Sequence, residues 1–527
     1  MKFFLLWAAI LLSLAPGTAQ VKVAVFSLND FHGGFVRNDS KGIAGAPSVW
    51  QTLDSLKREY PCHVTVSAGD AFGGSYFYQA TKGRLMPVFF NDLGIRISAV
   101  GNHEFDEGQR ALAAKWSHVA RPADWDLTYV CANIRQKSDG RIPSCFQPVA
   151  SVPVKLPGGQ TLRVAFVGLT ASSTPMQTSA RNVAGLTFDG NYPAVLDSVM
   201  RLPEHSLIDD AHLRLLLTHI GTYTDTEGRP AWDDMNADRL RALDSPLWDG
   251  ILSSHSHQLV CGRINAAQYP IVQGSWHGDF ISMLLCTIDT ARMVVTHVEP
   301  RTVRVTPKDK LEPGPAHLQA QIDSLLQHTT MCGLPIGTVL TTAKADMPHD
   351  RTDKYRQSPM GELVCRAYAE AFRTAAHLPD GAVVIGCSHF GSIRSGFGKG
   401  AVSVLDVGEA LPFSNKLKIY KLTGKQLHKL TEFGLNNKRY GWLQLGNAQA
   451  VRNHAGRVEA IIYRSPAGKR EVLQPKKKYY LVTDEFITNG GDGYSPDFFP
   501  ANQEVRTDGL PTTTDAFITY LRQQTEI

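Results

Sequence analysis

The stretch "ISAVGNHEFDEG", residues 97–108, joins an apolar run to a turn rich in polar side chains. Its first residues, Ile97 to Val100, form an apolar run typical of a buried strand. The turn that follows carries four polar, mostly ionisable side chains: Asn102, His103, Glu104 and Asp106. A strand that leaves the core and delivers such groups to one turn is typical of a ligand site at the edge of a sheet.

The same pattern recurs after four other apolar runs between Val21 and Thr306. These segments read "FSLNDFHGG", "VSAGDAFGG", "LLLTHIG" and "ILSSHSHQ". Their polar residues are Asp30, His32, Asp70, His219, His255 and His257. In an open α/β sheet the C-terminal ends of the strands share one edge, where ligands bind. We therefore expect these groups, far apart in sequence, to converge in one pocket.

Carboxylate and amide oxygens together with imidazoles suit Zn²⁺ or Mn²⁺ better than Ca²⁺. With Asn102 the candidates number seven, which is too many for one ion but enough for two if one carboxylate bridges. Asp70 is the natural bridge, and such a pair of ions activates water and stabilises phosphoryl charge. A single histidine at a strand end is more often structural, so the prediction depends on all five motifs together. His277 in "QGSWHGDF" also follows a strand, but we expect it to pack or to hydrogen-bond beside a site that is already full.

The motifs "NDFHGG", "AGD", "GNHEFD", "THIG" and "SHSH", in this order, resemble those of the calcineurin-like metallophosphoesterases. Taken with the C-terminal half, the chain resembles the secreted 5′-nucleotidase family over nearly all of its length after the first residues. The resemblance implies these metal ligands: Asp30, His32, Asp70, Asn102, His219, His255 and His257. It also implies a catalytic pair in which His103, held by Asp106, faces the scissile phosphate.

The chemistry of this pair supports the implication. A protonated imidazole stabilises charge on the leaving alkoxide, and a carboxylate three residues further on keeps it cationic. We expect Glu104 to support the turn rather than to bind metal. One departure from the family is Ser254, which precedes His255 where glycine is usual.

The C-terminal half has its own glycine-rich turns, "KYRQSPMGELV", "CSHFGSIRSGFGKGAV", "ALPFSNKLKIYKLTG" and "FITNGGDGYSPDF". An aromatic pair can sandwich a base, and arginines can take phosphate or carboxyl oxygens, although any single phenylalanine more often packs in a core. The segments "NGGDG", "SIR" and "LPF" are similar to the nucleotide-binding domain of 5′-nucleotidases. That similarity implies that Phe413 and Phe486 stack on the base and that Asp492 holds the ribose hydroxyls.

The similarity further implies that Arg356 and Arg394 lie near the phosphate or the ribose. Two departures affect the expected base contacts. His389 stands where the family usually has asparagine, and residues 358–361 read "SPMG" where Ser-Asn-x-Gly is common.

The 527-residue length predicts at least two domains, and a net charge of +5 without a dense basic run disfavours nucleic-acid binding.

Residues 1–19, "MKFFLLWAAILLSLAPGTA", are typical of a secretory signal peptide. We therefore expect an exported protein, periplasmic or secreted, with no membrane span. The eight cysteines form no CxxC pair, so a zinc ribbon is excluded. Cys131 and Cys145 are the nearest candidates for a disulfide, whereas Cys286 is expected to be a buried thiol.

These observations predict a two-domain α/β protein. Its parts are a signal peptide (1–19), a four-layer α/β/β/α metallophosphoesterase sandwich (20–306), a linker helix (307–330) and an α/β substrate-binding domain (331–527). In the linker, Leu318, Ile322, Leu325 and Leu326 fall on one helical face. The expected function is two-metal hydrolysis of nucleoside 5′-monophosphates, part of nucleotide catabolism. The alternatives are a nucleoside diphosphate sugar hydrolase, a cyclic-nucleotide phosphodiesterase and an exported nucleotide-binding protein without activity; the aromatic pair disfavours a thiosulfonate hydrolase.

Overall fold

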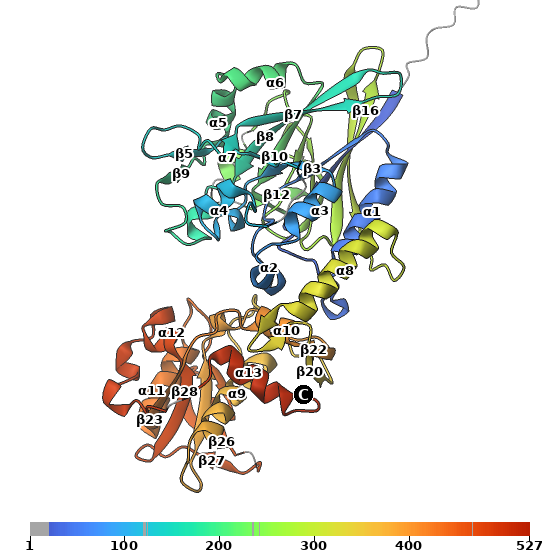
Figure 1. The fold of residues 1–527 in the computed structure, drawn as a ribbon. Helices are drawn as coiled ribbons and strands as arrows, with labels where there is room; N and C mark the ends of the chain where they lie inside the picture. Colours follow the sequence, from blue (N-terminus) through green and yellow to red (C-terminus); the bar gives the residue numbers. More distant parts are fainter. Residues whose placement is uncertain are drawn as a thin grey trace, which may run out of the picture. The chain divides into compact units, whose positions relative to one another are not determined.

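The computed structural model describes residues 20–527 except 120–122, 124, 234, 236, 242, 466 and 508. The signal peptide expected at residues 1–19 therefore lies outside the described residues. Within the described part, no helix is both long and apolar enough to span a bilayer. The chain forms two compact units: one comprises the residues up to Asn38 and Gly42–Gln319, and the other comprises Asp39–Lys41 and Ala320–Ile527 (Figure 1). The domain limits at 306 and 330 stay predictions.

The first unit is built on two β-sheets. The seven-stranded sheet has the order β17-β16-β1-β2-β3-β4-β6. Its strands are β1 (Gln20–Leu28), β2 (His63–Ser67), β3 (Ile95–Ala99), β4 (Thr128–Val130), β6 (Phe146–Gln147), β16 (Phe280–Asp289) and β17 (Val294–Arg304). The six-stranded sheet has the order β14-β15-β13-β10-β8-β7. Its strands are β7 (Val149–Lys155), β8 (Thr161–Thr170), β10 (Leu213–His219), β13 (Gly250–Leu252), β14 (Leu259–Ile264) and β15 (Tyr269–Gly274).

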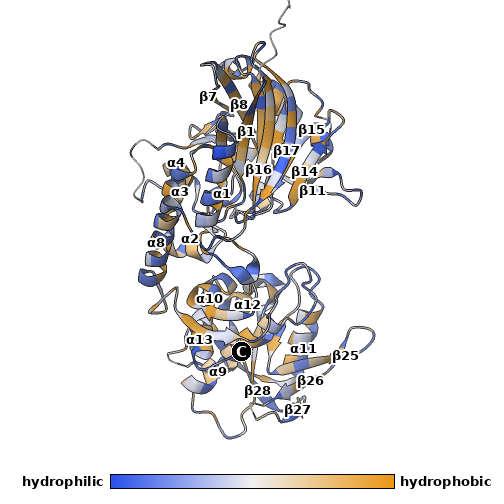
Figure 2. Cartoon of the chain, turned by 90° about the vertical axis from the view of Figure 1, so that its right-hand side faces the viewer, coloured by the Kyte–Doolittle hydropathy of each residue, from blue (hydrophilic) through white to orange (hydrophobic). Residues whose placement is uncertain are grey.

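The two sheets pack face to face through alternating side chains. Val23 and Val25 of β1 share one buried cluster with Leu213 and Leu215 of β10, as the period of two in a strand requires. The opposite face of the six-stranded sheet packs with Val195 in a second cluster. Figure 2 shows these central strands as mainly hydrophobic. The arrangement is the layered α/β sandwich that the sequence predicted.

Helices and minor strands complete the first unit. The helices are α1 (Ala46–Glu59), α2 (Tyr76–Thr81), α3 (Met86–Asp92), α4 (Gln109–Ala114), α5 (Tyr192–Val199), α6 (Ser206–Asp209) and α7 (Ala237–Arg241). Helix α8 (Pro313–His328) contributes residues to both units, which divide between Gln319 and Ala320. Two small ribbons pair β5 (Ile134–Gln136) with β9 (Leu186–Phe188) and β11 (Gly221–Thr224) with β12 (Pro230–Asp233). On α8 the predicted apolar face is present: Leu318 and Ile322 are buried, and Leu325 and Leu326 are half-buried.

The direction of the strands explains where the polar motifs meet. Strands β1, β2, β3 and β4 are mutually parallel, and so are β8, β10 and β13. All of them therefore end at one edge of their sheet, and the loops after β1, β2, β3, β10 and β13 carry the polar motifs.

The second unit has a four-stranded sheet in the order β23-β28-β21-β24. Its strands are β21 (Val384–Ser388), β23 (Leu417–Thr423), β24 (Gln444–Gly446) and β28 (Lys478–Asp484). Smaller sheets contain β18 (Thr330–Met331), β19 (Leu334–Pro335), β20 (Val339–Ala343), β22 (Gly400–Ser403), β25 (Ala448–Arg452), β26 (Val458–Arg464) and β27 (Arg470–Val472). The helices are α9 (Pro359–Ala375), α10 (Val404–Ala410), α11 (Gly424–Leu435), α12 (Glu485–Thr488) and α13 (Thr513–Arg522).

Local sequence fixes the starts of these helices. Ser358 caps α9 by accepting the Gly361 N–H, and Pro359 occupies its first turn. Thr423 and Gln426 form a capping box at the start of α11. Together the two units confirm the predicted two-domain α/β fold class.

The candidate disulfide between Cys131 and Cys145 is not formed, and both are free thiols. Cys131 is fully buried, with its Sγ 3.2 Å from Thr170 Oγ1. Cys286 is buried and free as expected.

Candidate metal centre and nucleoside cavity

The loops at the strand ends adopt strained backbone conformations. Five of the seven candidate ligands have positive φ: Asp30 (48°), His32 (48°), Asp70 (56°), His255 (83°) and His257 (58°). A residue with a Cβ enters this region at a cost of order 1–3 kcal/mol, and such residues cluster at functional sites. Ser254 has no positive φ, so a serine in place of the usual glycine introduces no backbone strain.

The structure brings the predicted side chains together in three overlapping groups that could hold a cation. Asp30, His32 and His257 form one group, and Asp70, His219 and His255 form another. The third, His32, Asp70 and His103, lies across these two and includes the predicted catalytic histidine. The Nε2 atoms of His32 and His257 are 3.0 Å apart, and Nδ1 of His255 is 3.2 Å from Nε2 of His219.

Asp70 lies between the first two groups. Its Oδ2 is 3.2 Å from Nε2 of His219 and 3.6 Å from Nε2 of His32. Ligands at about 2.1 Å from one tetrahedral ion lie roughly 3.4 Å apart, so this spacing fits a carboxylate that two ions share. The other oxygen, Oδ1, accepts a hydrogen bond from the backbone N–H of His103 at 2.9 Å.

The chemistry of these side chains fits divalent cations. The Oδ1 atom of Asn102 is buried and has no hydrogen-bond partner among the described residues, which is costly unless an ion or another group takes its lone pairs. Burial lowers the pKa of His32, and it lowers the pKa of His255 to about 3 and of His257 to about 4. These imidazoles are therefore neutral, the form that binds a metal ion. Burial also raises the pKa of Asp30, a carboxyl that a cation would stabilise in its charged form.

Neighbouring groups orient the rings and carboxylates. Nδ1 of His219 lies 2.9 Å from the Ala68 carbonyl oxygen and 2.8 Å from Ser254 Oγ. Because a carbonyl only accepts, Nδ1 carries a proton. Burial lowers the pKa of His219, but the charge of Asp70 and the hydrogen bond to it outweigh burial and raise this pKa to about 10, so Nε2 faces Asp70 as a position where a cation would replace a proton. The Ser254 hydroxyl thus supports a ligand in a way that glycine could not. Asp30 accepts hydrogen bonds from the His255 backbone N–H and from Asn29 Nδ2 at 2.9 Å each.

The outermost ring, His257, is held by stacking. Trp276 lies on it with centroids 5.0 Å apart and an interplanar angle of 14°, and the other partner of Trp276 is His277 at 4.0 Å. The backbone N–H of His277 donates to the Asp30 carbonyl at 2.9 Å. His277 therefore packs beside the site, as the sequence suggested. Neither Asn29 nor Trp276 was identified from sequence; only the position of Asn29 next to Asp30 could have indicated it.

His103 and Asp106 form the predicted pair, with Nδ1 of the imidazole 2.6 Å from Oδ2 of the carboxylate. They lie in the short 3₁₀ helix His103–Phe105 and just after it. Burial lowers the pKa of His103, but the charge of Asp70 and the hydrogen bond to Asp106 outweigh it and raise this pKa to about 9. His103 is therefore cationic at neutral pH. Its side chain is one-third exposed, so it can reach a substrate.

Glu104 is fully buried and organises the loops through its carboxylate. Oε2 accepts the backbone N–H groups of Gly101 at 2.6 Å and of Asp70 at 2.9 Å, and Oε1 accepts that of Ala71 at 2.7 Å. One side chain thereby ties the turn after β3 to the loop after β2. This is the supporting role that we expected for Glu104.

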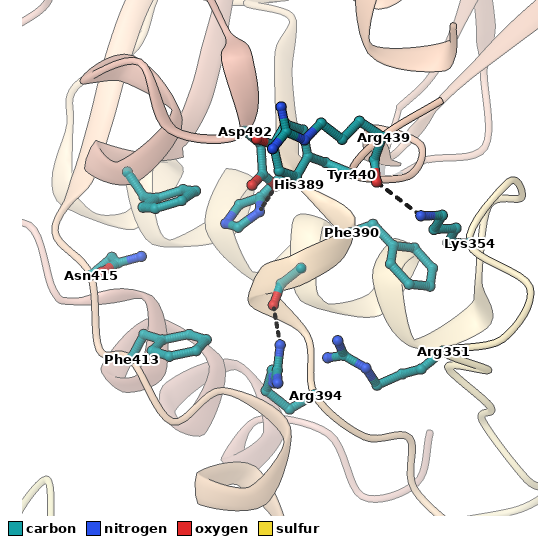
Figure 3. Close-up of a pocket in the computed structure, with 12 residues that line it drawn as sticks. Arg351, Lys354, His389, Phe390, Arg394, Phe413, Asn415, Arg439, Tyr440 and Asp492 are labelled. Carbon is teal, nitrogen blue, oxygen red and sulfur yellow. Dashed lines mark hydrogen bonds and ion pairs between the residues drawn. The ribbon is translucent and has the colours of Figure 1, made fainter. Parts of the chain in front are cut away.

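The second unit contains a cavity of about 510 Å³ where the glycine-rich turns meet (Figure 3). The predicted residues that line it are His389, Arg394, Phe413, Phe486 and Asp492. Phe413 and Phe486 are 56% and 41% exposed, so both rings are accessible to a ligand. The guanidinium of Arg394 lies 5.9 Å from the ring centroid of Phe413.

Arg356 is not among the residues that line this cavity. Its guanidinium faces two carboxylates instead, with Nε 3.4 Å from Asp353 and an Nη 3.9 Å from Asp350. The cavity has other polar residues that the sequence reasoning missed: Arg351, Lys354, Asn415, Arg439 and Tyr440. Asn415 follows the quoted "LPF" segment, whereas the other four come from loops without a recognisable motif. Only the positive charges of Arg351, Lys354 and Arg439 could have indicated these loops.

Comparison with known proteins agrees with this geometry. Residues 335–499 match the family model described as "5'-nucleotidase, C-terminal domain". The chain is 23% identical over 84% of its length to the trifunctional nucleotide phosphoesterase protein YfkN of Bacillus subtilis, and spans 30% of that protein. It is also 23% identical to the 5′-nucleotidase of Bos taurus, over 91% of this chain and 85% of the relative. A crystal structure of a 5′-nucleotidase precursor from Thermus thermophilus superposes with a TM-score of 0.62 at 22% identity, covering 96% and 97% of the two chains.

The fold is the two-domain fold of the 5′-nucleotidases of known structure, with polar side chains that converge at the strand ends of the first unit. Residues 335–499 match the 5′-nucleotidase C-terminal domain, and the chain as a whole is similar to 5′-nucleotidases.

Proposed function

We propose that this protein is an exported phosphoesterase that uses two divalent metal ions to hydrolyse nucleoside 5′-monophosphates to nucleoside and phosphate. The observation that carries the proposal is the pair of ligand groups in contact with one shared carboxylate, Asp70. If these seven converging polar groups had only a structural role, the backbone strain of the five residues with positive φ would serve no function.

In this proposal the ions, Zn²⁺, Mn²⁺ or similar, are held by the two groups with Asp70 as the bridge and Asn102 as a further ligand. Bound there, two divalent ions supply an activated water and neutralise charge on the phosphoryl oxygens. The residues of the chain fix the positions of these ligands. Glu104 does so by joining the two loops, and Ser254 does so through its contact with Nδ1 of His219, which helps to orient the ring.

His103 would act on the leaving group. The charge of Asp70 and the hydrogen bond to Asp106 keep its imidazole protonated, and it is accessible beside the ligand groups. A cationic N–H at this position stabilises the negative charge that develops on the phosphoryl and leaving oxygens. The same N–H can donate its proton to the leaving alkoxide.

Nucleoside recognition would belong to the cavity of the second unit. Phe413 offers an exposed ring for stacking on the base, and Arg394 offers donors for phosphate or ribose oxygens. The names of two relatives support a nucleotide substrate: one is a trifunctional nucleotide phosphoesterase and the other a 5′-nucleotidase.

A second substrate class has its own supporting observation. Four cationic side chains line the cavity, those of Arg351, Lys354, Arg394 and Arg439, and the one carboxylate among the lining residues, Asp492, is already hydrogen-bonded to His389. This excess of positive charge also suits a nucleotide that carries a second phosphate, such as a nucleoside diphosphate sugar.

The test is phosphate release from AMP by the full-length protein, with Mn²⁺ or Zn²⁺ and after chelation. Metal content is measured on the same samples by elemental analysis. We expect about two ions per chain and loss of turnover on chelation that either ion restores. Turnover that persists after complete metal removal would refute the proposal. A parallel panel of a nucleoside diphosphate sugar and a cyclic nucleotide separates the alternatives.

A further inference from the structure

His389 is tied to Asp492 inside the nucleoside cavity. Its side chain is buried, and Nδ1 lies 2.7 Å from Oδ2 of the carboxylate. Asp492 is in turn positioned through its backbone, because its carbonyl accepts a hydrogen bond from Asn437 Nδ2 at 3.1 Å. Figure 3 shows the His389–Asp492 pair at the wall of the cavity that also presents Phe413 and Asn415.

The contact with Asp492 decides which nitrogen of the neutral imidazole is protonated. A carboxylate only accepts, so the proton is on Nδ1 and Nε2 carries a lone pair. In the neutral imidazole, Nε2 is thus an acceptor on the cavity wall with no hydrogen-bond partner among the described residues.

The orientation of the ring brings that acceptor into the layer where a base would stack. His389 lies over Phe486 with centroids 4.7 Å apart and an interplanar angle of 23°. The imidazole covers part of this face, so a base stacked on the uncovered part of the Phe486 ring would lie beside the imidazole and nearly in its plane. Hydrogen bonds to base edges form in that plane, so Nε2 is suited to accept from a base N–H.

Other residues of the cavity favour the same type of base. Arginine and lysine side chains only donate, so Arg351 and Arg439 suit a carbonyl oxygen rather than an amino group. The side chains of Asn415 and Tyr440 can donate or accept, so they favour neither a carbonyl oxygen nor an amino group on the base. An acceptor at Nε2 of His389, surrounded by arginine donors, complements a base edge that has a ring N–H next to a carbonyl oxygen.

We propose that His389 determines base specificity and that the protein prefers nucleotides whose base has a ring N–H beside a carbonyl: hypoxanthine, guanine and uracil. Adenine and cytosine present a ring lone pair at this position, which would face the lone pair of Nε2. The inference rests on the proposed nucleotidase function and names its substrate class.

The test compares kcat/KM for matched substrates. IMP and AMP differ only at the edge concerned, as do UMP and CMP. We expect kcat/KM to be at least about tenfold higher for IMP than for AMP and for UMP than for CMP, because a site built for one hydrogen-bond pattern rejects the analogue that lacks it. Equal values, or a preference for AMP and CMP, would overturn the proposal.

Two variants link the preference to the residue. His389→Asn replaces the acceptor by an amide that can donate or accept, so the IMP/AMP ratio should fall toward one. Asp492→Asn removes the carboxylate that holds a proton on Nδ1 of His389, so it should also lower the IMP/AMP ratio. A matched control is His454→Asn on an exposed turn, which should keep the wild-type ratio. A ratio unchanged by His389→Asn would refute the role of this residue.

The ratio separates specificity from damage to the protein, because misfolding or metal loss lowers both rates together. It also separates the two proposals. Phosphate release from none of the nucleotides, by metal-loaded wild-type protein, would reject the nucleotidase function itself. Release from all of them without an IMP/AMP preference would reject only the role of His389.

Discussion

Replacing Phe413 by alanine should weaken nucleotide binding with little effect on folding. The ring is 56% exposed, so it contributes little to the core of the second unit. A phenylalanine of about 200 Å² with this exposure offers roughly 110 Å² to a ligand, worth about 2.8 kcal/mol if fully covered, at about 25 cal/mol per Å². Half coverage gives about 1.4 kcal/mol, and measured base stacking falls in the range of about 1–3 kcal/mol. KM for AMP should therefore rise roughly ten- to a hundredfold.

Ribose 5-phosphate is the matched substrate, because it keeps the sugar and the phosphate but has no base. We expect Phe413→Ala to reduce kcat/KM for ribose 5-phosphate much less than for AMP. Phe413→Trp, which keeps an aromatic face, should retain most of the AMP activity. Steady-state kinetics of both substrates, with thermal unfolding and metal analysis of each variant, give the comparison. Equal losses on both substrates from a folded, metal-loaded variant would refute the stacking role.

Four further outcomes follow from the geometry. Asp70→Asn should abolish turnover and weaken the binding of both ions, and two ions with high activity in this variant would contradict the bridge. His103→Ala should lower kcat about 10²–10⁴-fold with KM and metal content nearly unchanged, whereas loss of metal would make His103 a ligand. Glu104→Ala should destabilise the fold by about 1–3 kcal/mol for each buried N–H it orphans, measured by urea unfolding; an unchanged midpoint would show that water replaces the carboxylate. Arg394→Ala should raise KM for AMP about tenfold and Arg356→Ala much less, and the reverse order would favour the sequence-based role of Arg356.

Much of the metal centre was predictable because each motif follows a recognisable strand. The residues after "VKVAVFSL" and "HVTVSA" needed only the rule that parallel strands end at a common edge. The structure brings Asp30 and Asp70 to that edge with the four histidines of the set, while the ligand roles stay predictions. Asn29 and Trp276 were not found because an ordinary amide and an ordinary aromatic residue give no signal until their neighbours are known.

The nucleoside cavity was less predictable for a physical reason. Its lining comes from irregular loops, whose side-chain directions follow no period. Arg356 and Lys354 are two residues apart in one such loop, yet Lys354 lines the cavity and Arg356 faces Asp353. Sequence spacing could not distinguish the two cations.

The sequence by itself determined the fold class, the order of the strands that end in polar motifs, and the types of residue brought to their ends. These properties follow from local patterns, because apolar runs of strand length and glycine-rich turns have the same meaning wherever they occur. The fold, and no local pattern, places an acceptor against Nδ1 of His219 and of His389 and so puts a proton on that nitrogen. In each case the deciding acceptor, the Ala68 carbonyl or the Asp492 carboxylate, lies more than a hundred residues away in the chain. A proton is placed by the atom within hydrogen-bond distance, and that distance depends on how the chain folds back on itself.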